Sequence, residues 1–356
     1  MRIERVEVTS VELPYKKPLI TATNSFVTAQ GVLVRVIAYS AEGFGFADLF
    51  PRTGESLESC RYAIETVIKP RILGRDLREL AQLRKEIDRV IIGNLRAKAA
   101  LETALYDALA KNLRAPLYLL LGGRLRNEIR IIKMLGLDSP EAMAEEAKRL
   151  VDQGFSALKI KMSGERDLDI RRLGLIRNKV GDQIFLKVDA NEAYDAKTAI
   201  HVAKKLADLG VEIFEQPVPR SQIDALREVK RKSPIKIEAD QTVRTAEEAY
   251  ALVRSRIVDG INTSIQKSGG LNEVRRIAEL CEMVGVHCAL SNTAGSMVGD
   301  AAALHLAASV PGIAPLCEIG EFETISGDPF TGLKIENGAL RVPDATGLGV
   351  FPKGSE

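Results

Sequence analysis

The chain contains no tryptophan, three histidines and four cysteines, and no apolar run long enough to span a membrane. The cysteines, at positions 60, 281, 288 and 317, show no Cys-x-x-Cys spacing. We therefore expect free thiols in a reducing compartment rather than disulfides or a cysteine zinc site. The N-terminus also lacks the apolar core of a signal peptide. Together these absences predict a cytoplasmic protein that has no membrane partner.

The few histidines argue against two common types of active site. His201 and His305 fall in segments with a helical pattern, and His287 begins an apolar run typical of a strand. We expect all three to be structural. A Ser-His-Asp hydrolase and a zinc site built from histidines are therefore poorly supported.

The charges are balanced and scattered. Fifty basic residues stand against 48 acidic ones, a formal net charge of +2, and the basic residues are scattered along the chain. We therefore expect no nucleic-acid partner. The length of 356 residues is sufficient for a large barrel and a smaller domain.

The first 125 residues are interpreted as an α+β domain. Residues 2–14 and 31–40 show the β-branched alternation of antiparallel strands, and Ala41–Gly45 is expected to be the turn that follows. The small, polar stretch 19–30 is predicted to be a loop. Between residues 56 and 120, apolar residues recur at three- and four-residue steps, which predicts helices.

A strand–helix repeat begins at Ile129 and predicts a parallel β/α barrel. Amphipathic helices separate the candidate strands, and Ser139-Pro140 marks one helix start. A doubly wound open sheet is the alternative, but eight evenly spaced strands favour closure. The candidate strands cover residues 129–137, 157–163, 183–190, 211–215, 235–240, 258–265, 286–291 and 314–320.

Three carboxylates stand at the ends of successive candidate strands. Asp189, Glu215 and Asp240 are 26 and 25 residues apart, which is the length of one strand, one helix and two loops. A single carboxylate after a strand is usually a helix cap or a solvated charge. Three in phase would meet at the carboxyl-terminal rim of a barrel, where active sites lie. Such oxygen ligands suit Mg²⁺.

Lys159 and Lys161 lie two residues apart on one candidate strand, so their side chains point to the same side. The flanking apolar residues indicate a buried strand rather than a solvated face. Burial and the repulsion between two ammonium groups both lower the pKa of a lysine, as a general base requires. We therefore expect this pair to be catalytic.

The motifs LKIKM, KVDANEAY, IFEQPV, IEADQT and KSGGLNE resemble those of the enolase superfamily, specifically its mandelate-racemase-like and muconate-lactonizing-enzyme-like branches. The resemblance covers the whole chain. It implies a capping domain (1–125), a (β/α)₇β barrel (126–328) and a tail (329–356) that returns to the cap. It also implies a homo-oligomer that binds a small carboxylate substrate, with Mg²⁺, or Mn²⁺ as a substitute.

The resemblance also implies roles for individual residues. Asp189, Glu215 and Asp240 would hold the metal, Lys161 would remove the proton next to the substrate carboxylate, and Lys159 would support it. The resulting enediolate would be stabilised by the metal. Five further residues are candidate substrate contacts: Asn191, Ser264, Lys267, Asn292 and Glu318. For Glu318 the alternative is a salt bridge at the rim.

Two departures from the family pattern shape the functional hypothesis. Ser264 stands at the position counted for a second lysine, and Gln241 replaces an acidic residue after the third ligand. These favour a single-lysine reaction, either cycloisomerisation or an elimination like that of a dehydratase or o-succinylbenzoate synthase. The alternative is a racemase or epimerase of an amino-acid derivative or dipeptide, with Lys267 or water as the second acid. A non-catalytic binding barrel is the alternative from another class.

Overall fold

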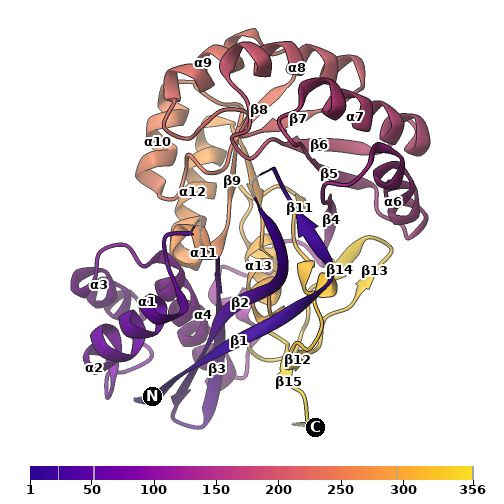
Figure 1. Cartoon of the computed structure of the whole chain (residues 1–356). Coiled ribbons are helices and arrows are strands. Elements are labelled where there is room, and N and C mark those ends of the chain that lie inside the picture. The colour runs from indigo at the N-terminus through magenta and orange to yellow at the C-terminus, as the bar shows by residue number, and fades with distance from the viewer. Residues whose placement is uncertain (23, 51–52, 294, 355–356) are drawn as a thin grey trace.

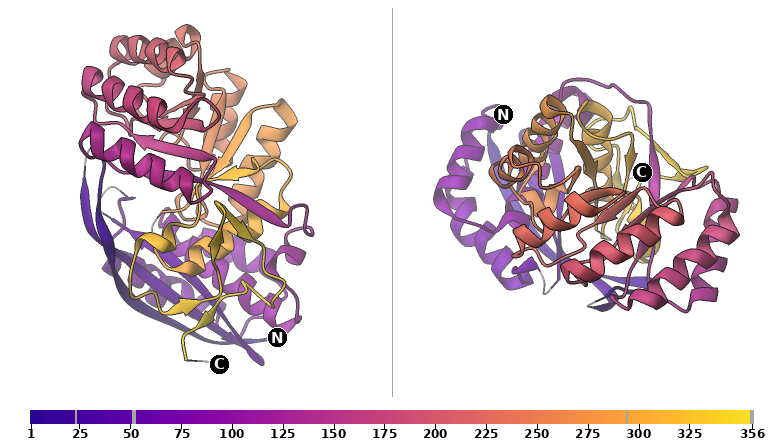
Figure 2. Two further views of the ribbon diagram at one scale, coloured as in Figure 1. Left: turned by 90° about the vertical axis from the view of Figure 1, so that its right-hand side faces the viewer. Right: turned by 90° about the horizontal axis from the view of Figure 1, so that it is seen from above.

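The computed structural model describes residues 1–22, 24–50, 53–293 and 295–354. The chain forms a closed barrel with an antiparallel sheet and a group of helices against its side and mouth (Figure 1). The C-terminal segment runs back beside the N-terminal sheet, and both termini lie at the same end of the molecule (Figure 2).

The N-terminal sheet has three antiparallel strands, β1 (Ile3–Ile20), β2 (Ser25–Ala38) and β3 (Ala41–Leu49). The loop predicted at 19–30 is wrong, because β1 and β2 remain paired almost to their tip, with Ile20 opposite Ser25. Residue 23 of that stretch lies outside the described residues.

The turn predicted at Ala41–Gly45 is also wrong, because these residues belong to β3. Gly43 and Gly45 serve close packing instead. A Cβ on Gly45 would lie 1.8 Å from the carbonyl oxygen of Ala100 in the helix beneath. The sheet therefore rests directly on the backbone of that helix.

The helices predicted between residues 56 and 120 are confirmed, and they cover one face of this sheet. The longest, α4, is buried along most of its length because it also packs against the barrel helix α11 (Ile265–Ser268). The cap helices are α1 (Leu57–Tyr62), the π-helix η2 (Ala63–Ile68), α2 (Lys69–Ile72), α3 (Leu80–Val90), α4 (Leu95–Asn112) and α5 (Leu117–Leu120).

The eight predicted barrel strands are confirmed, and they form a closed parallel barrel. Neighbouring strands pair in sequence order, the last strand pairs with the first, and a bridge between Ser291 and Glu318 joins the remaining two. The open-sheet alternative is thereby excluded. The strands are β4 (Glu128–Leu135), β5 (Ala157–Lys161), β6 (Phe185–Asp189), β7 (Ile213–Glu215), β8 (Lys236–Ala239), β9 (Gly260–Thr263), β10 (His287–Leu290) and β11 (Leu316–Cys317).

Helices connect the strands and surround the barrel. The predicted start at Ser139-Pro140 is confirmed, since Ser139 caps the first of these helices by accepting a hydrogen bond from the Ala142 amide. With the short α11 set aside, seven helices link eight strands in the described part of the barrel, which is the (β/α)₇β order. The barrel helices are α6 (Pro140–Asp152), α7 (Arg166–Val180), α8 (Ala196–Asp208), α9 (Ile223–Lys232), α10 (Ala246–Arg254), α12 (Leu271–Val284) and α13 (Met297–Ser309).

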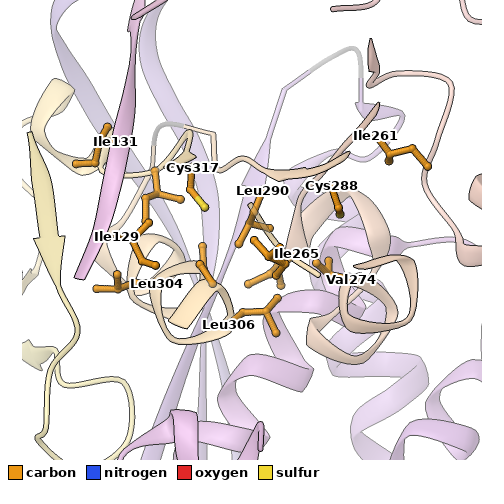
Figure 3. Close-up of a cluster of buried hydrophobic side chains, with 14 of the residues drawn as sticks. Ile129, Ile131, Ile261, Ile265, Val274, Cys288, Leu290, Leu304, Leu306 and Cys317 are labelled. Carbon is orange, nitrogen blue, oxygen red and sulfur yellow. The ribbon is translucent and has the colours of Figure 1, made fainter. Parts of the chain in front are cut away.

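The core lies mainly between the strands and the helices that follow them. Figure 3 shows one part, where Cys288 and Leu290 of β10 meet side chains of α12 and α13. Cys288 and Cys317 are buried free thiols, as expected. No helix in the described part of the chain is both long and apolar enough to cross a membrane.

The tail consists of short strands, and it returns to the cap. The backbone amide of Leu117 donates to Gly347 O (2.8 Å), and the amide of Leu348 donates to Asp107 Oδ1 on α4 (2.8 Å). The helical turn η3 (Glu321–Thr324) follows the last barrel strand. The tail contains the strands β12 (Phe330–Thr331), β13 (Ile335–Glu336), β14 (Ala339–Arg341) and β15 (Phe351–Pro352).

Candidate active site

A cavity of about 540 Å³ lies where the cap faces the carboxyl-terminal rim of the barrel. The barrel contributes the residues predicted from sequence, and the cap contributes residues from β1, β2, β3 and the start of α4. All ten predicted site residues line this one cavity: Lys159, Lys161, Asp189, Asn191, Glu215, Asp240, Ser264, Lys267, Asn292 and Glu318.

Asp189, Glu215 and Asp240 stand on neighbouring strands. Asp189 and Glu215 are paired in register at the ends of β6 and β7, and Asp240 directly follows β8. The Nζ of Lys159 lies 3.2 Å from Asp189 Oδ2 and 2.7 Å from Glu215 Oε2, so one cation already bridges two of these carboxylates. Asp240 instead pairs with Lys267.

These three residues fit a hard divalent cation. All the donors are carboxylate oxygens, and Glu215 Oε1 is buried without a hydrogen-bond partner. Burial opposes ionisation of Glu215, but the ammonium groups of Lys159 and Lys187 outweigh it and hold the pKa of Glu215 below its usual range. The carboxylate is thus kept anionic, as a metal ligand must be.

A second group of carboxylates, Glu215, Glu238 and Glu318, lies deeper in the barrel with ligand atoms within 4.8 Å of one another. Its centre is already filled by the ammonium group of Lys187, which is 2.8 Å from Glu215 and 2.5 Å from Glu318 and also contacts Glu238. Lys187 is fully buried, and Glu238 does not line the cavity. The rim carboxylates are therefore the group that could hold a metal ion, and the deeper group forms an ion-pair layer beneath them.

The expected lowering of the Lys159 pKa is wrong. Burial by itself would lower this pKa, but the surrounding carboxylates, chiefly Asp189 and Glu215, outweigh burial and raise it well above its usual value. Lys159 is therefore held as a cation among these carboxylates. Lys161 lies two residues further along β5, at its carboxyl end, and its Nζ is 2.5 Å from Asp189 Oδ2.

Lys267 reaches the cavity although it does not lie on a strand. The short helix α11 follows β9, and Ser264 is its N-cap, accepting a hydrogen bond from the Lys267 amide (3.2 Å). This turn directs the Lys267 ammonium group inward, where it donates to the carbonyl oxygen of Asn262 (2.8 Å) and contacts Asp240. Counting strand ends alone had pointed to Ser264.

The two lysines face each other across the barrel. Lys161 ends β5 and Lys267 follows β9, and these strands are four positions apart in a closed ring of eight. Such strands lie on opposite sides of the ring. Each lysine contacts a different carboxylate of the proposed metal site, Asp189 or Asp240. The site therefore presents an amine from each side.

The remaining predicted contacts have structural partners as well. Asn191 donates to Asp189 through its backbone (2.8 Å) and its side chain (3.1 Å), and Asn292 donates to Asp300 (2.9 Å). Glu318 accepts from Lys159 (2.6 Å) and Lys187, so both its oxygens are engaged. This favours the ion-pair alternative for Glu318 over direct substrate binding.

The histidines are placed as expected. His201 is exposed on α8, His305 is buried in α13, and His287 begins β10. None of them lines the cavity. On the cap side of the cavity, the site residues named from sequence did not include Tyr15, Asp48 and Arg96. Only the fold brings these residues to the barrel rim.

Two family models match nearly the whole chain. Residues 3–122 match the N-terminal domain of mandelate racemase / muconate lactonizing enzyme, and residues 142–355 match the enolase C-terminal domain-like family. These matches confirm the resemblance inferred from the motifs.

Among curated proteins, the chain is 34% identical to the L-Ala-D/L-Glu epimerase of Bacillus subtilis (99% of this chain, 97% of that protein). It is 31% identical to a chloromuconate cycloisomerase of Cupriavidus necator (98% and 96%). Among solved structures, it matches a substrate-liganded complex of the B. subtilis epimerase with a TM-score of 0.95 (34% identity, 99% of both chains). It also matches the dipeptide epimerase of Enterococcus faecalis V583, solved with Mg and L-Leu-L-Tyr, with a TM-score of 0.94 (32% identity, 98% and 99%).

These relatives are isomerases, which confirms the expectation of an enzyme and weighs against a non-catalytic barrel. With matching models for both domains and relatives above 30% identity over the full length, the chain belongs to the enolase superfamily, in its mandelate racemase and muconate lactonizing enzyme branch.

Proposed function

We propose that the protein is a Mg²⁺-dependent racemase or epimerase that inverts the carbon next to the carboxylate of an amino-acid derivative, such as a dipeptide. The observation that carries this proposal is the placement of Lys161 and Lys267 on opposite sides of the rim. Relatives that are dipeptide epimerases support it. The single-lysine reaction favoured from sequence becomes the second candidate.

The roles that we propose for the carboxylates and the two lysines follow from their positions. Asp189, Glu215 and Asp240 would hold Mg²⁺, which supplies a positive charge against the substrate carboxylate and so makes the neighbouring proton more acidic. One lysine accepts that proton from its face of the α-carbon. The other lysine, already protonated, delivers a proton to the opposite face, and the configuration is inverted.

Lys159 cannot exchange roles with either base. It lies below the rim, buried among three carboxylates, and those carboxylates hold its proton. We infer that its charge keeps Asp189 and Glu215 together at the proposed metal site, and that it takes no proton from the substrate.

The test is deuterium incorporation from D₂O into each enantiomer or epimer of a turned-over substrate, measured by mass spectrometry. Wild type should label both configurations. Lys161→Ala should silence labelling of one configuration and Lys267→Ala labelling of the other, each by roughly 10²-fold or more. Lys334→Ala, which alters a lysine with a 79% exposed side chain, is the control.

Cycloisomerases among the relatives keep a one-sided reaction as the second candidate. In that case only one configuration exchanges, and Lys267→Ala does not change which one. Labelling of a single configuration in the wild type would thus overturn the two-base proposal.

A further inference from the structure

The cap side of the cavity contains a carboxylate, Asp48, on a face of β3 whose neighbouring side chains are apolar. Alternate residues of a strand share a face. On β3, Phe44 and Phe46 pack with the barrel core, whereas Ala47 and Leu49 pack with the cap helices. Asp48 therefore shares the barrel-facing side with the two phenylalanines and lines the cavity.

Arg96, at the start of α4, pairs with Asp48. The NH1 group of Arg96 lies 2.6 Å from Asp48 Oδ1, and the side chains are only 10% and 5% exposed. The guanidinium lies over the ring of Phe50 at 5.1 Å, and Phe50 contacts Phe26 edge to face. This pair is thus a defined, largely dehydrated feature of the cavity wall and not a mobile surface contact.

The second oxygen of Asp48 is unused. Oδ2 is buried and accepts no hydrogen bond in the described structure. Leaving such an oxygen unpaired costs free energy, and native proteins normally satisfy it. Tyr15, on the same side of the cavity, lies close enough to Asp48 for the carboxylate charge to help raise the pKa of its phenol, after burial as the main cause.

The other carboxylates of the cavity are engaged. Glu55 accepts from the backbone amides of Arg96 (3.0 Å) and Ala97 (3.3 Å) at the start of α4. Both oxygens of Glu318 accept from lysines. Apart from the proposed metal ligands, Asp48 is therefore the carboxylate in the described cavity lining that has an oxygen to spare.

Among the described residues, the arginines that line the cavity are also paired. Arg96 is held by Asp48, Arg220 by Glu192 (2.8 Å), and Arg244 by Glu248 (3.3 Å). A substrate with a second carboxylate remote from the reacting one would therefore have to displace an existing ion pair. A hydrogen-bond donor at that end of the substrate could bind without displacing an ion pair.

We propose that Asp48 Oδ2 accepts a hydrogen bond from an ammonium group of the substrate remote from its reacting carboxylate, so that the substrate class is dipeptides with a free amino terminus rather than N-acylated amino acids. This inference rests on the proposed racemase or epimerase function. An ammonium group is the donor best matched to a carboxylate, because both partners are charged. Asp48 is then a specificity residue that takes no part in proton transfer.

The experiment compares alanyl dipeptides with N-propionyl and N-succinyl amino acids that share the same reacting residue. An N-propionyl group differs from an alanyl group only in lacking the amine, and the succinyl group adds a carboxylate. Wild type should incorporate deuterium from D₂O into the alanyl compounds at least about 10-fold faster than into their propionyl counterparts. The succinyl compounds should be slowest.

Two variants should move this preference in opposite directions. Asp48→Asn removes the negative charge and frees Arg96, so the alanyl-to-propionyl ratio should fall toward one and succinyl compounds should gain. Arg96→Gln leaves Asp48 unneutralised, so the ratio should rise. Asp88→Asn is the control, because Asp88 also pairs with cations in the cap but does not line the cavity.

The outcomes separate the two proposals. Absence of exchange with every compound in the folded wild type would contradict the proposed function. Exchange that shows no alanyl preference, or a preference that Asp48→Asn leaves unchanged, would overturn the ammonium site alone. Should Asp48→Asn fail to fold, a ratio in Arg96→Gln that falls instead of rising would overturn it equally.

Discussion

Glu215 is the residue on which the proposed metal site depends most, because it is fully buried at the centre of the three rim carboxylates and has an oxygen without a partner. We expect Mg²⁺ to raise the thermal unfolding temperature of the wild type, since a ligand that binds only the folded state stabilises it. At a concentration of 100 times Kd the gain is about 2.7 kcal/mol. Glu215→Gln should lose most of this gain in a thermal shift measurement.

Glu215 also pairs with Lys159 and Lys187, so its substitution could lower stability by itself. The informative quantity is therefore the increment produced by Mg²⁺ in each variant. Asp240→Asn, at a less buried ligand, should likewise lose the increment, and Glu336→Gln, at an exposed position, should keep it. If Mg²⁺ raised the unfolding temperature of both rim variants as much as that of the wild type, the metal would not bind at the rim.

At the scale of elements, β3 packs directly against the backbone of α4. A Cβ on Gly45 would overlap the carbonyl oxygen of Ala100 and lie 3.0 Å from the amide nitrogen of Ala104. Because both obstacles are backbone atoms, they cannot move aside as a side chain could. Gly45→Ala should therefore destabilise the protein by roughly 2 kcal/mol or more, measured by urea unfolding.

Gly174 in α7 is the matched control. A Cβ there meets nothing within 4 Å, and alanine is the better helix former. Gly174→Ala should be neutral or stabilise by up to about 1 kcal/mol. Similar losses for both variants would show that close packing of β3 on α4 does not limit substitution at Gly45.

At the scale of the whole molecule, His305 ties the barrel to the cap and the tail. Its Nδ1 accepts from the Tyr118 amide on α5 (3.3 Å), and its Nε2 donates to Leu348 O (3.1 Å), which requires a neutral ring. Burial lowers the pKa of His305 to about 4 from an ordinary value of 6.5. The unfolded chain therefore binds this proton more tightly than the folded one.

The stability that His305 contributes is thus complete above about pH 6.5 and is lost as the pH falls toward 4. We expect the difference in unfolding free energy between wild type and His305→Gln to shrink by up to about 3 kcal/mol between pH 8 and pH 4. His201→Gln, at an exposed histidine, should show no such pH dependence. A constant difference for His305→Gln would contradict a neutral, buried ring.

The sequence determined the barrel and its carboxylate triad because both are local, repeated signals. Parallel strands are buried on both faces and therefore read as short apolar runs, and each run ends at the same rim. Asp189 and Glu215 close such runs and Asp240 follows one, so their spacing alone placed them together. The pair Lys159 and Lys161 was equally visible, because alternation on a strand puts both on one face.

Local signals misled where a segment's conformation depends on its partner. The small residues at 41–45 resembled a turn, but Gly43 and Gly45 are small because α4 lies against them. The polar stretch at 19–30 resembled a loop, but cross-strand pairing extends β1 and β2 through most of it. The pKa of Lys159 was misjudged for a similar reason, since the carboxylates that raise it come from other strands.

Only the tertiary structure decided the features that give this site its individual chemistry. Lys267 enters the cavity because α11 turns it inward, which the count of strand ends could not show. Asp48 and Arg96 are 48 residues apart and become partners only when β3 packs on α4. Periodicity records where an element begins and which face it buries, whereas contacts between distant segments depend on how the elements pack. The superfamily and Lys267 as a candidate could thus be inferred from the sequence, whereas the inward position of Lys267 and the cap-side carboxylate could be found only from the fold.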